Sequence, residues 1–237
     1  MRLSVAFGRM LLCGLFAVAA LPADAQSGCP PQSWRVLFDG SSTKGWRTYG
    51  ETTLRPQWHI VDGALTLSEP GGGNITFGEN VTGDFEFELE WRVAPGGNSG
   101  ILYFVDPGDE TKMPWDTGLE MQMLDNATNQ DRFNPLTRAG AMYSLYPPSS
   151  EMANPAGQWN KARIRVEGSN VEQWLNGVRV VAVDLDSEEF ANRLRSSKFS
   201  RIPNFAKKHS GLIVLQDHLS YDHAAYIQFR DIRIRKL

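Results

Sequence analysis

The chain has 237 residues, and its 24 basic and 27 acidic side chains give a net charge of −3 at pH 7. This weak acidity argues against a nucleic-acid-binding protein, which needs a basic face. Only two cysteines are present, too few for a disulfide-stapled scaffold. The composition therefore predicts a domain stabilised by its own hydrophobic core.

The first residues have the pattern of a secretory signal peptide. Arg2 and Arg9 provide a positive start, Met10 to Leu21 is almost wholly apolar, and Ala23-Asp24-Ala25 supplies a small-x-small cleavage site. The apolar run is shorter than the roughly 20 residues of a membrane-spanning helix. We expect a signal peptide over residues 1–25 and an exported chain, periplasmic or secreted, that starts near Gln26.

The cysteines bear on the same question. Cys13 belongs to the predicted signal peptide, so Cys29 is left without a partner in the mature chain. A lipid anchor at Cys29 ranks second to free export, because Gln26-Ser27-Gly28 lacks the leucine that usually stands three residues before a lipidated cysteine. No later apolar run is long enough to span a membrane.

Most of the remaining chain reads as β-strands. Over 84–93, apolar residues alternate strictly with Glu86, Glu88, Glu90 and Arg92, which predicts one buried face and one wet face. The same period recurs over 161–167. The further strand candidates are 34–38, 58–61, 64–68, 99–104, 118–124, 211–216 and 225–235.

Two local signals define turns within this pattern. Asn176-Gly177, between Leu175 and Val178, is the dipeptide typical of a tight hairpin. The last strand changes phase along its length, which predicts a β-bulge near Arg230-Asp231.

One helix is expected. Asp186 and Glu189 have capping-box spacing, Phe190 and Leu194 share a face, and Arg193 lies near the end of the helix. Many short strands with one small helix indicate an all-β jelly-roll sandwich. No repeat or linker divides residues 26–237, so we predict a single domain.

The segment 118–125 carries unusual polarity. Its alternation turns Leu119, Met121 and Met123 inward and Glu120 and Gln122 to the opposite face, and Asp125 follows at the strand end. An ordinary solvent-facing strand would also explain this pattern. The functional interpretation is that this face lines a cleft.

A second strand raises the weight of that interpretation. Gln216 and His218 share one parity with the apolar positions before them, and Asp217 lies between them at the strand end. Imidazole is the side chain best suited to proton transfer near neutral pH. The sequence alone does not show whether this strand adjoins the strand of Glu120.

Other catalytic patterns are missing from the sequence. There is no phosphate-binding loop before a helix, no zinc-ligand spacing and no nucleophile elbow. A divalent cation such as calcium, held by carboxylates, remains open because hard cations take oxygen ligands. The candidate ligands are Asp106, Asp109, Glu110 and Asp125.

Short motifs along nearly the whole mature chain resemble the 3-keto-disaccharide hydrolase domain family. Each motif is weak alone, and their order makes the resemblance specific. They are Leu37-Phe38-Asp39-Gly40, Gly45-Trp46, Trp58 with Asp62-Gly63, Asn98-Ser99-Gly100-Ile101, Glu120-x-Gln122-x-Leu124-Asp125, Gly140-Ala141-Met142-Tyr143, Trp159-Asn160, Leu175-Asn176-Gly177 and Leu215-Gln216-Asp217-His218.

The resemblance implies a concanavalin-like jelly roll whose concave face cleaves 3-keto-glycosides by C2 proton abstraction, elimination at C1 and hydration. Glu120 and His218 are then the acid and base, in either order. Asp125, as a third catalytic residue, or Asp217 would orient the imidazole or hold a metal. Asn98, Gln122, Tyr143 and Gln216 are expected to bind sugar hydroxyls. From their position in loops, Arg138 or Lys112 is expected to polarise the ketone and Trp115 to stack on the sugar.

The chain departs from the family at two places. Tyr103-Phe104-Val105 stands where many members carry a basic residue, and Leu219-Ser220 replaces the usual glycine after the histidine. A carbohydrate-binding module on the same fold is the first alternative to an enzyme, and a structural domain is the second. The sequence leaves the sugar linkage, the aglycone, the metal requirement and the oligomeric state open.

Overall fold

The computed structural model describes residues 1, 32–108, 113–219 and 226–237. The predicted signal peptide and Cys29 lie outside these ranges. So do Asp109, Glu110 and Lys112.

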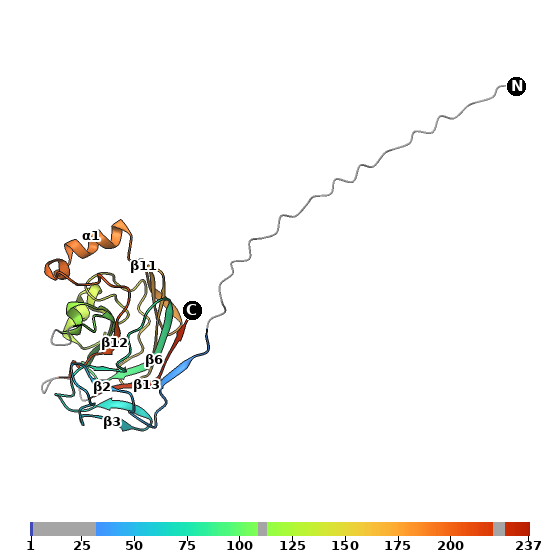
Figure 1. The fold of residues 1–237 in the computed structure, drawn as a ribbon. Helices are drawn as coiled ribbons and strands as arrows, with labels where there is room; N and C mark the ends of the chain where they lie inside the picture. Colours follow the sequence, from blue (N-terminus) through green and yellow to red (C-terminus); the bar gives the residue numbers. More distant parts are fainter. Residues whose placement is uncertain (2–31, 109–112, 220–225) are drawn as a thin grey trace.

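The described chain forms two antiparallel sheets stacked face to face (Figure 1). The eight-stranded sheet has the order β11-β10-β9-β6-β13-β4-β3, and β1 pairs with β13 beside this path. Its strands are β1 (Arg35–Phe38), β3 (Trp58–Val61), β4 (Ala64–Leu67), β6 (Phe85–Val93), β9 (Asn160–Glu167), β10 (Asn170–Leu175), β11 (Val178–Asp184) and β13 (Ile227–Lys236).

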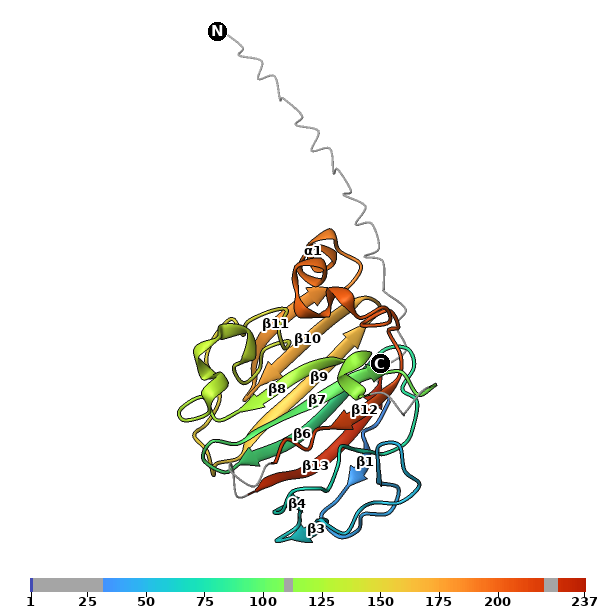
Figure 2. The same ribbon diagram turned by 90° about the vertical axis from the view of Figure 1, so that its left-hand side faces the viewer.

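The five-stranded sheet has the order β2-β5-β12-β7-β8, and Figure 2 shows β12, β7 and β8 in front of the larger sheet. Its strands are β2 (Arg47–Thr48), β5 (Ile75–Thr76), β7 (Asn98–Val105), β8 (Leu119–Leu124) and β12 (Leu212–Leu215). The predicted all-β jelly-roll sandwich is confirmed. The two-residue strands β2 and β5 were not predicted, because two residues carry no periodicity.

Period-2 alternation builds the core between the sheets. Phe85, Phe87, Leu89 and Trp91 of β6 point inward and are each 1 % exposed. From the smaller sheet, the inward side chains of β8 meet them in one continuous cluster. Burial of an aromatic or aliphatic side chain contributes roughly 1.5–3 kcal/mol, so this shared core holds the sheets together.

The two predicted turn features are confirmed. Leu175 pairs with Val178 across Asn176 and Gly177, which both have positive φ (50° and 84°), as a tight hairpin requires. The register of β13 against β6 shifts between Arg230 and Arg233 at a bulge. The bulge lets the two halves of β13 pair with β4 and β1 in turn.

Helix α1 (Glu188–Ser196) lies at one end of the sandwich and leads into the 3-10 helix η4 (Lys198–Arg201) (Figure 2). The expected cap at Asp186 is wrong by one residue, because Ser187 Oγ accepts the backbone N–H of Phe190. None of the described helices has the length and apolarity to cross a membrane.

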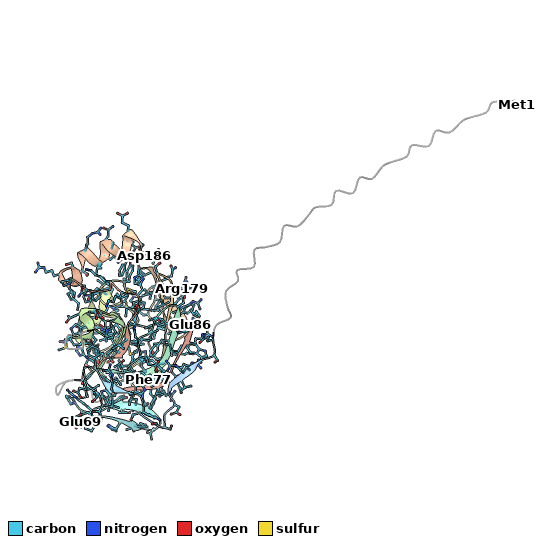
Figure 3. The ribbon with its side chains drawn as sticks, viewed as in Figure 1. Met1, Glu69, Phe77, Glu86, Arg179 and Asp186 are labelled. Carbon is cyan, nitrogen blue, oxygen red and sulfur yellow. The ribbon has the colours of Figure 1, made fainter. Side chains whose placement is uncertain are left out.

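The outer face of β6 is less wet than predicted. Glu86, labelled in Figure 3, and Glu88 are only 1 % and 6 % exposed, although the alternation of β6 turns both away from the core. The flanking strands carry arginines, whose side chains are longer than those of glutamate and cover the two carboxylates. Arg165 contacts Glu86 at 3.0 Å, and Arg233 contacts Glu88 at 2.6 Å. A cross-strand ladder of ion pairs therefore covers this face.

Removing one carboxylate from this ladder should be costly. Burial raises the pKa of Glu86, but hydrogen bonds from Arg235 and Arg165 outweigh burial and hold the pKa below its usual value. We expect Glu86→Gln to lower the free energy of unfolding by about 3 kcal/mol, because it leaves the arginines without a buried counter-charge. Urea denaturation measures this change.

Glu79→Gln is the matched control, because the Arg35–Glu79 pair is about half exposed on both sides. It should cost less than about 1 kcal/mol. Equal losses in the two variants would contradict a stabilising role for burial of the ladder.

Candidate active site

The outer face of the five-stranded sheet carries the polar residues expected on β8. Leu119, Met121 and Met123 point into the core, so Glu120 and Gln122 point to the other side. Both are buried, with 8 % and 1 % of their surface exposed. Burial of these polar side chains on the face away from the core means that other parts of the chain enclose a pocket there.

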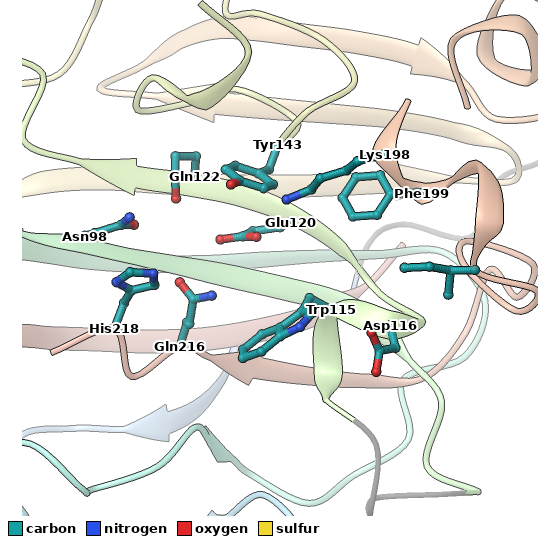
Figure 4. Close-up of a pocket in the computed structure, with 11 residues that line it drawn as sticks. Asn98, Trp115, Asp116, Glu120, Gln122, Tyr143, Lys198, Phe199, Gln216 and His218 are labelled. Carbon is teal, nitrogen blue, oxygen red and sulfur yellow. The ribbon is translucent and has the colours of Figure 1, made fainter. Parts of the chain in front are cut away.

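The strand order brings the second polar group to the same face. β7 lies between β8 and β12, with Leu102 opposite Glu120 and Ile101 opposite Leu215. Beyond β12, the backbone N–H of Gln216 bonds to Gly100 O at 3.0 Å. Gln216 and His218 therefore lie across β7 from Glu120 and Gln122, as Figure 4 shows.

These side chains line a cavity of 390 Å³, within the usual size range of small-ligand sites. Strands β7 and β8 and the segment that follows β12 form its floor. The 3-10 helices η1 (Pro114–Asp116) and η4 form part of its rim. The lining residues are Asn98, Trp115, Asp116, Glu120, Gln122, Tyr143, Lys198, Phe199, Ile202, Gln216 and His218.

Glu120 lies in the middle of this cavity (Figure 4). Burial raises the pKa of its carboxyl from 4.5 to about 8, and the positive charge of Lys198 opposes part of that rise. Glu120 is therefore mostly protonated at neutral pH. A carboxyl group in this state can donate a proton to a bound ligand.

Gly100 provides the space for this carboxyl group. A Cβ atom at Gly100 would lie 2.2 Å from Glu120 Oε1 and 2.9 Å from Glu120 Cδ. Any side chain at this position would displace the carboxyl group. The glycine of β7 is thus required for the geometry of the neighbouring strand's acid.

Lys198 brings a cation to the cavity from η4. Its Nζ lies 4.1 Å from the centre of the Tyr143 ring, an arrangement that stabilises an ammonium group near an aromatic face. Sequence reasoning missed Lys198, Asp116, Phe199 and Ile202, because they lie in short 3-10 segments and at their ends, without a periodic pattern. The only local signal near Lys198 was the capping motif of the preceding helix, which predicts that helix and not the cavity.

Two buried amide oxygens at the cavity have no partner among the described residues. They are Asn98 Oδ1 and Gln216 Oε1. A buried acceptor without a hydrogen bond is costly, so these atoms suit a ligand that brings hydroxyl donors. Gln122 differs, because its Oε1 accepts the backbone N–H of Met123 at 3.2 Å and leaves the amide nitrogen as donor.

Tyr143 is held beside Glu120 by an extension of the sheet. Its backbone N–H donates to Glu120 O at 2.9 Å, and Gln122 N donates to Ala141 O at 3.0 Å. Residues 140–143 therefore continue the five-stranded sheet beyond β8. This pairing places the Tyr143 ring in the cavity.

The two candidate aspartates lie elsewhere. Asp125 accepts the backbone N–H of Gly96 at 2.8 Å and of Ala127 at 3.0 Å, and Asp217 accepts those of Gly73 and Leu219. Neither lines the cavity. Both carboxylates bind loop backbone in the structure, and the expectation that one of them orients the imidazole or holds a metal stays a prediction.

Of the remaining predicted residues, some line the cavity and others lie elsewhere. Trp115 lines the cavity as expected. Arg138 does not: it donates to Arg132 O at 2.8 Å and pairs with Glu151. Lys112 lies outside the described residues. Within the described ranges no three His, Cys, Asp or Glu side chains gather as a metal site, and Asp106 pairs with Lys208 at 2.8 Å.

Comparison with known proteins identifies the family. The family model described as the 3-keto-alpha-glucoside-1,2-lyase-like domain matches residues 33–235. The chain belongs to this family. A relative from Bacteroides thetaiotaomicron is named 3-keto-disaccharide hydrolase. It is 29 % identical over an aligned length of 264 residues, gaps included, and the alignment covers 99 % of this chain and 87 % of the relative. Both matches support a glycosidase-type enzyme that cleaves glycosides.

Solved structures agree with the fold. A candidate glycosyl hydrolase from Parabacteroides distasonis is 26 % identical with a TM-score of 0.77, over 86 % of this chain and 94 % of that one. A Bacillus subtilis protein of unknown function with a galectin-like fold has a TM-score of 0.58 at 12 % identity, over 88 % of this chain and 96 % of that one. The second likeness concerns the fold alone.

Residues 103–105, where the resemblance led us to expect a basic residue, are packed in apolar surroundings. Tyr103 and Phe104 both point into the core, because a positive φ of 61° at Phe104 shifts the alternation of β7. Val105 then packs on the outer face with Leu102 and Val214. This segment brings no cation to the cavity, whereas Lys198 on η4 does.

Proposed function

We propose that this protein cleaves 3-keto-glycosides by elimination followed by hydration. The observation that carries the proposal is Glu120, buried so that its pKa rises to about 8, in a cavity that also holds His218 and two amide oxygens without a partner among the described residues. A sugar can satisfy those oxygens with its hydroxyl groups. The family match and the name of the Bacteroides relative support the choice of a 3-keto sugar.

The reaction needs an acid and a base but no activated nucleophile. A ketone at C3 acidifies the hydrogen at C2, so a base removes that proton and leaves an enolate. The enolate electrons form the C1–C2 double bond as the C1–O bond breaks, and an acid protonates the leaving oxygen. Water then adds across the double bond, which gives the free keto sugar and completes a net hydrolysis.

The electrostatics favour one assignment of these roles. Glu120 carries a proton at neutral pH, so it serves as the acid for the leaving oxygen. His218, exposed at the cavity rim, serves as the base at C2 and exchanges its proton with solvent. The amide nitrogen of Gln122 donates to the ketone oxygen and to the enolate oxygen that forms from it.

Lys198 supports the acid rather than the enolate. Its charge favours the ionised form of Glu120. When Glu120 gives its proton to the leaving group, the resulting carboxylate faces this ammonium group. Lys198 is therefore a positioning residue whose charge stabilises the acid after proton transfer.

Incubation of the purified protein with a 3-keto-glucoside and with its unoxidised parent tests the proposal. Release of the aglycone from the keto form alone is the expected result, because only the ketone acidifies C2. Parallel reactions with a chelator measure whether a divalent cation contributes. Release from neither substrate by the folded protein would support a carbohydrate-binding module instead.

The pH profile of kcat/KM tests the assignment of roles. We expect kcat/KM to fall as the pH rises through about 8, because Glu120 then loses the proton that it must donate. If Glu120 were the base, kcat/KM would instead rise through the same range. A pH series with one substrate and constant ionic strength separates the two cases.

We also propose that the chain is exported and cleaved before Gln26. The charged start, the apolar run and Ala23-Asp24-Ala25 support this proposal. The intact mass of the protein purified from its source cells tests it. A mass that retains residues 1–25 would contradict cleavage, and a lipid mass on Cys29 would replace free export with an anchor.

A further inference from the structure

The two ends of the cavity differ in chemistry. Hydrogen-bonding side chains gather at one end, and apolar side chains gather at the other (Figure 4). The first end holds Asn98, Gln122, Gln216 and His218. The second holds Trp115 and Phe199, with the carboxylate of Asp116 beside them. Ile202, which also lines the cavity, follows at the end of η4, where its backbone N–H donates to Phe199 O at 2.9 Å. Glu120 lies between them, where a glycosidic oxygen must lie to receive its proton.

The apolar end is held in place by the core. Phe199 is 5 % exposed and stacks on Phe205 with ring centroids 3.9 Å apart and planes 7° apart. Trp115, half-buried on η1, packs against the outer-face cluster of Leu102, Val105, Leu212 and Val214. These contacts fix both rings before any ligand binds, which reduces the entropy cost of binding.

This arrangement bears on the leaving group, and the argument rests on the function proposed above. With the keto sugar among the amides and Glu120 at the glycosidic oxygen, the aglycone extends toward Trp115, Phe199 and Ile202. We propose that this end accepts a flat, uncharged aromatic aglycone in preference to a second sugar. The protein would then act on aryl 3-keto-glycosides.

The polar groups at this end decide between the two kinds of aglycone. A second hexose brings several hydroxyl groups. Among the described residues, this end offers them only the Asp116 carboxylate, the Trp115 indole N–H and the Lys198 ammonium group, which already faces the Tyr143 ring. Hydroxyl groups buried without partners are costly, whereas an aromatic ring gains contact with Trp115 and Phe199.

The test compares phenyl 3-keto-glucoside with a 3-keto-glucosyl-glucose of the same anomeric configuration. Ile202→Asn should lower kcat/KM for the phenyl substrate about tenfold relative to the disaccharide, because it replaces apolar contact with an amide. Ile202→Leu, the matched control, should leave this ratio within about twofold. The intrinsic difference between the leaving groups cancels when variants are compared with the wild type.

Trp115→Leu is the second variant in case Ile202→Asn fails to fold, and it should lower the same ratio because it removes the flat ring. Equal effects of the folded variants on both substrates would overturn the proposal, as would a wild-type preference for the disaccharide.

A binding measurement separates this inference from the proposed reaction. Calorimetry with unoxidised phenyl glucoside and methyl glucoside requires no turnover. Phenyl glucoside should bind about tenfold more tightly, and Ile202→Asn should remove most of the difference. If no keto-glycoside is cleaved but this difference appears, the reaction is wrong and the apolar aglycone end stands. Equal affinities for the two glucosides would overturn the inference.

Discussion

Glu120→Gln should lower kcat/KM by about a thousandfold while the affinity for a 3-keto-glycoside stays within a few fold. Glutamine has the size of glutamate and keeps a hydrogen-bonding group in the cavity, but it has no acidic proton for the leaving oxygen. General acid catalysis contributes about 10² to 10⁴ in rate, which sets the size of the loss. Single-turnover kinetics and calorimetry measure the two quantities separately.

The same variant tests whether the carboxyl group is neutral in the folded protein. Its pKa is raised by burial from 4.5 to about 8, so the folded state holds this proton more tightly than the unfolded state. The contribution of Glu120 to stability is therefore complete below pH 4.5 and is lost as the pH rises to about 8. The shift corresponds to an upper bound of about 5 kcal/mol.

Glutamine does not ionise, so Glu120→Gln should escape this loss. We expect the variant to have a higher Tm than the wild type at pH 9 and nearly the same Tm at pH 4. Comparing two proteins at each pH cancels the titration of all other groups. The same Tm difference at both values would show that the carboxyl group is ionised in the folded protein, and the role as acid would then fail.

The local pattern of the sequence was enough to predict the sandwich. Strict alternation over 84–93 and 161–167, the Asn176-Gly177 turn and the bulge near Arg230 each depend on neighbouring residues alone. The helix cap was placed one residue early, because both Asp186 and Ser187 can act as caps. The burial of Glu86 was missed, because it depends on arginines from two other strands.

The site residues likewise separate into those that local strand parity predicts and those that depend on the topology of the fold. Glu120, Gln122 and Gln216 were found because strand parity places them on one face. The adjacency of their strands, across β7, is a property of topology that parity does not contain. Parity does not place Asp125, because a carboxylate at a strand end can equally line a cavity or accept backbone N–H groups of the following loop, as it does in this structure. Lys198 reaches the cavity from the short 3-10 helix η4, which follows α1 and has no periodic pattern in the sequence.

Gly100→Ala should remove most of the activity although it adds a single methyl group. The new Cβ would lie 2.2 Å from Glu120 Oε1, so the carboxyl group must leave its position above β7. A displacement of about 1 Å at a catalytic group can reduce the rate about a hundredfold. We expect a loss of kcat/KM of that size, measured with the same 3-keto-glycoside.

A double variant shows whether the methyl group acts through Glu120. In the Glu120→Gln background the acid is already lost, so adding Gly100→Ala should reduce kcat/KM by less than about threefold. Gly108→Ala, at an exposed glycine outside the cavity, should leave activity unchanged. If the two losses multiplied fully in the double variant, Gly100→Ala would act on the strand or on substrate binding. The requirement for glycine at this position would then come from something other than the acid.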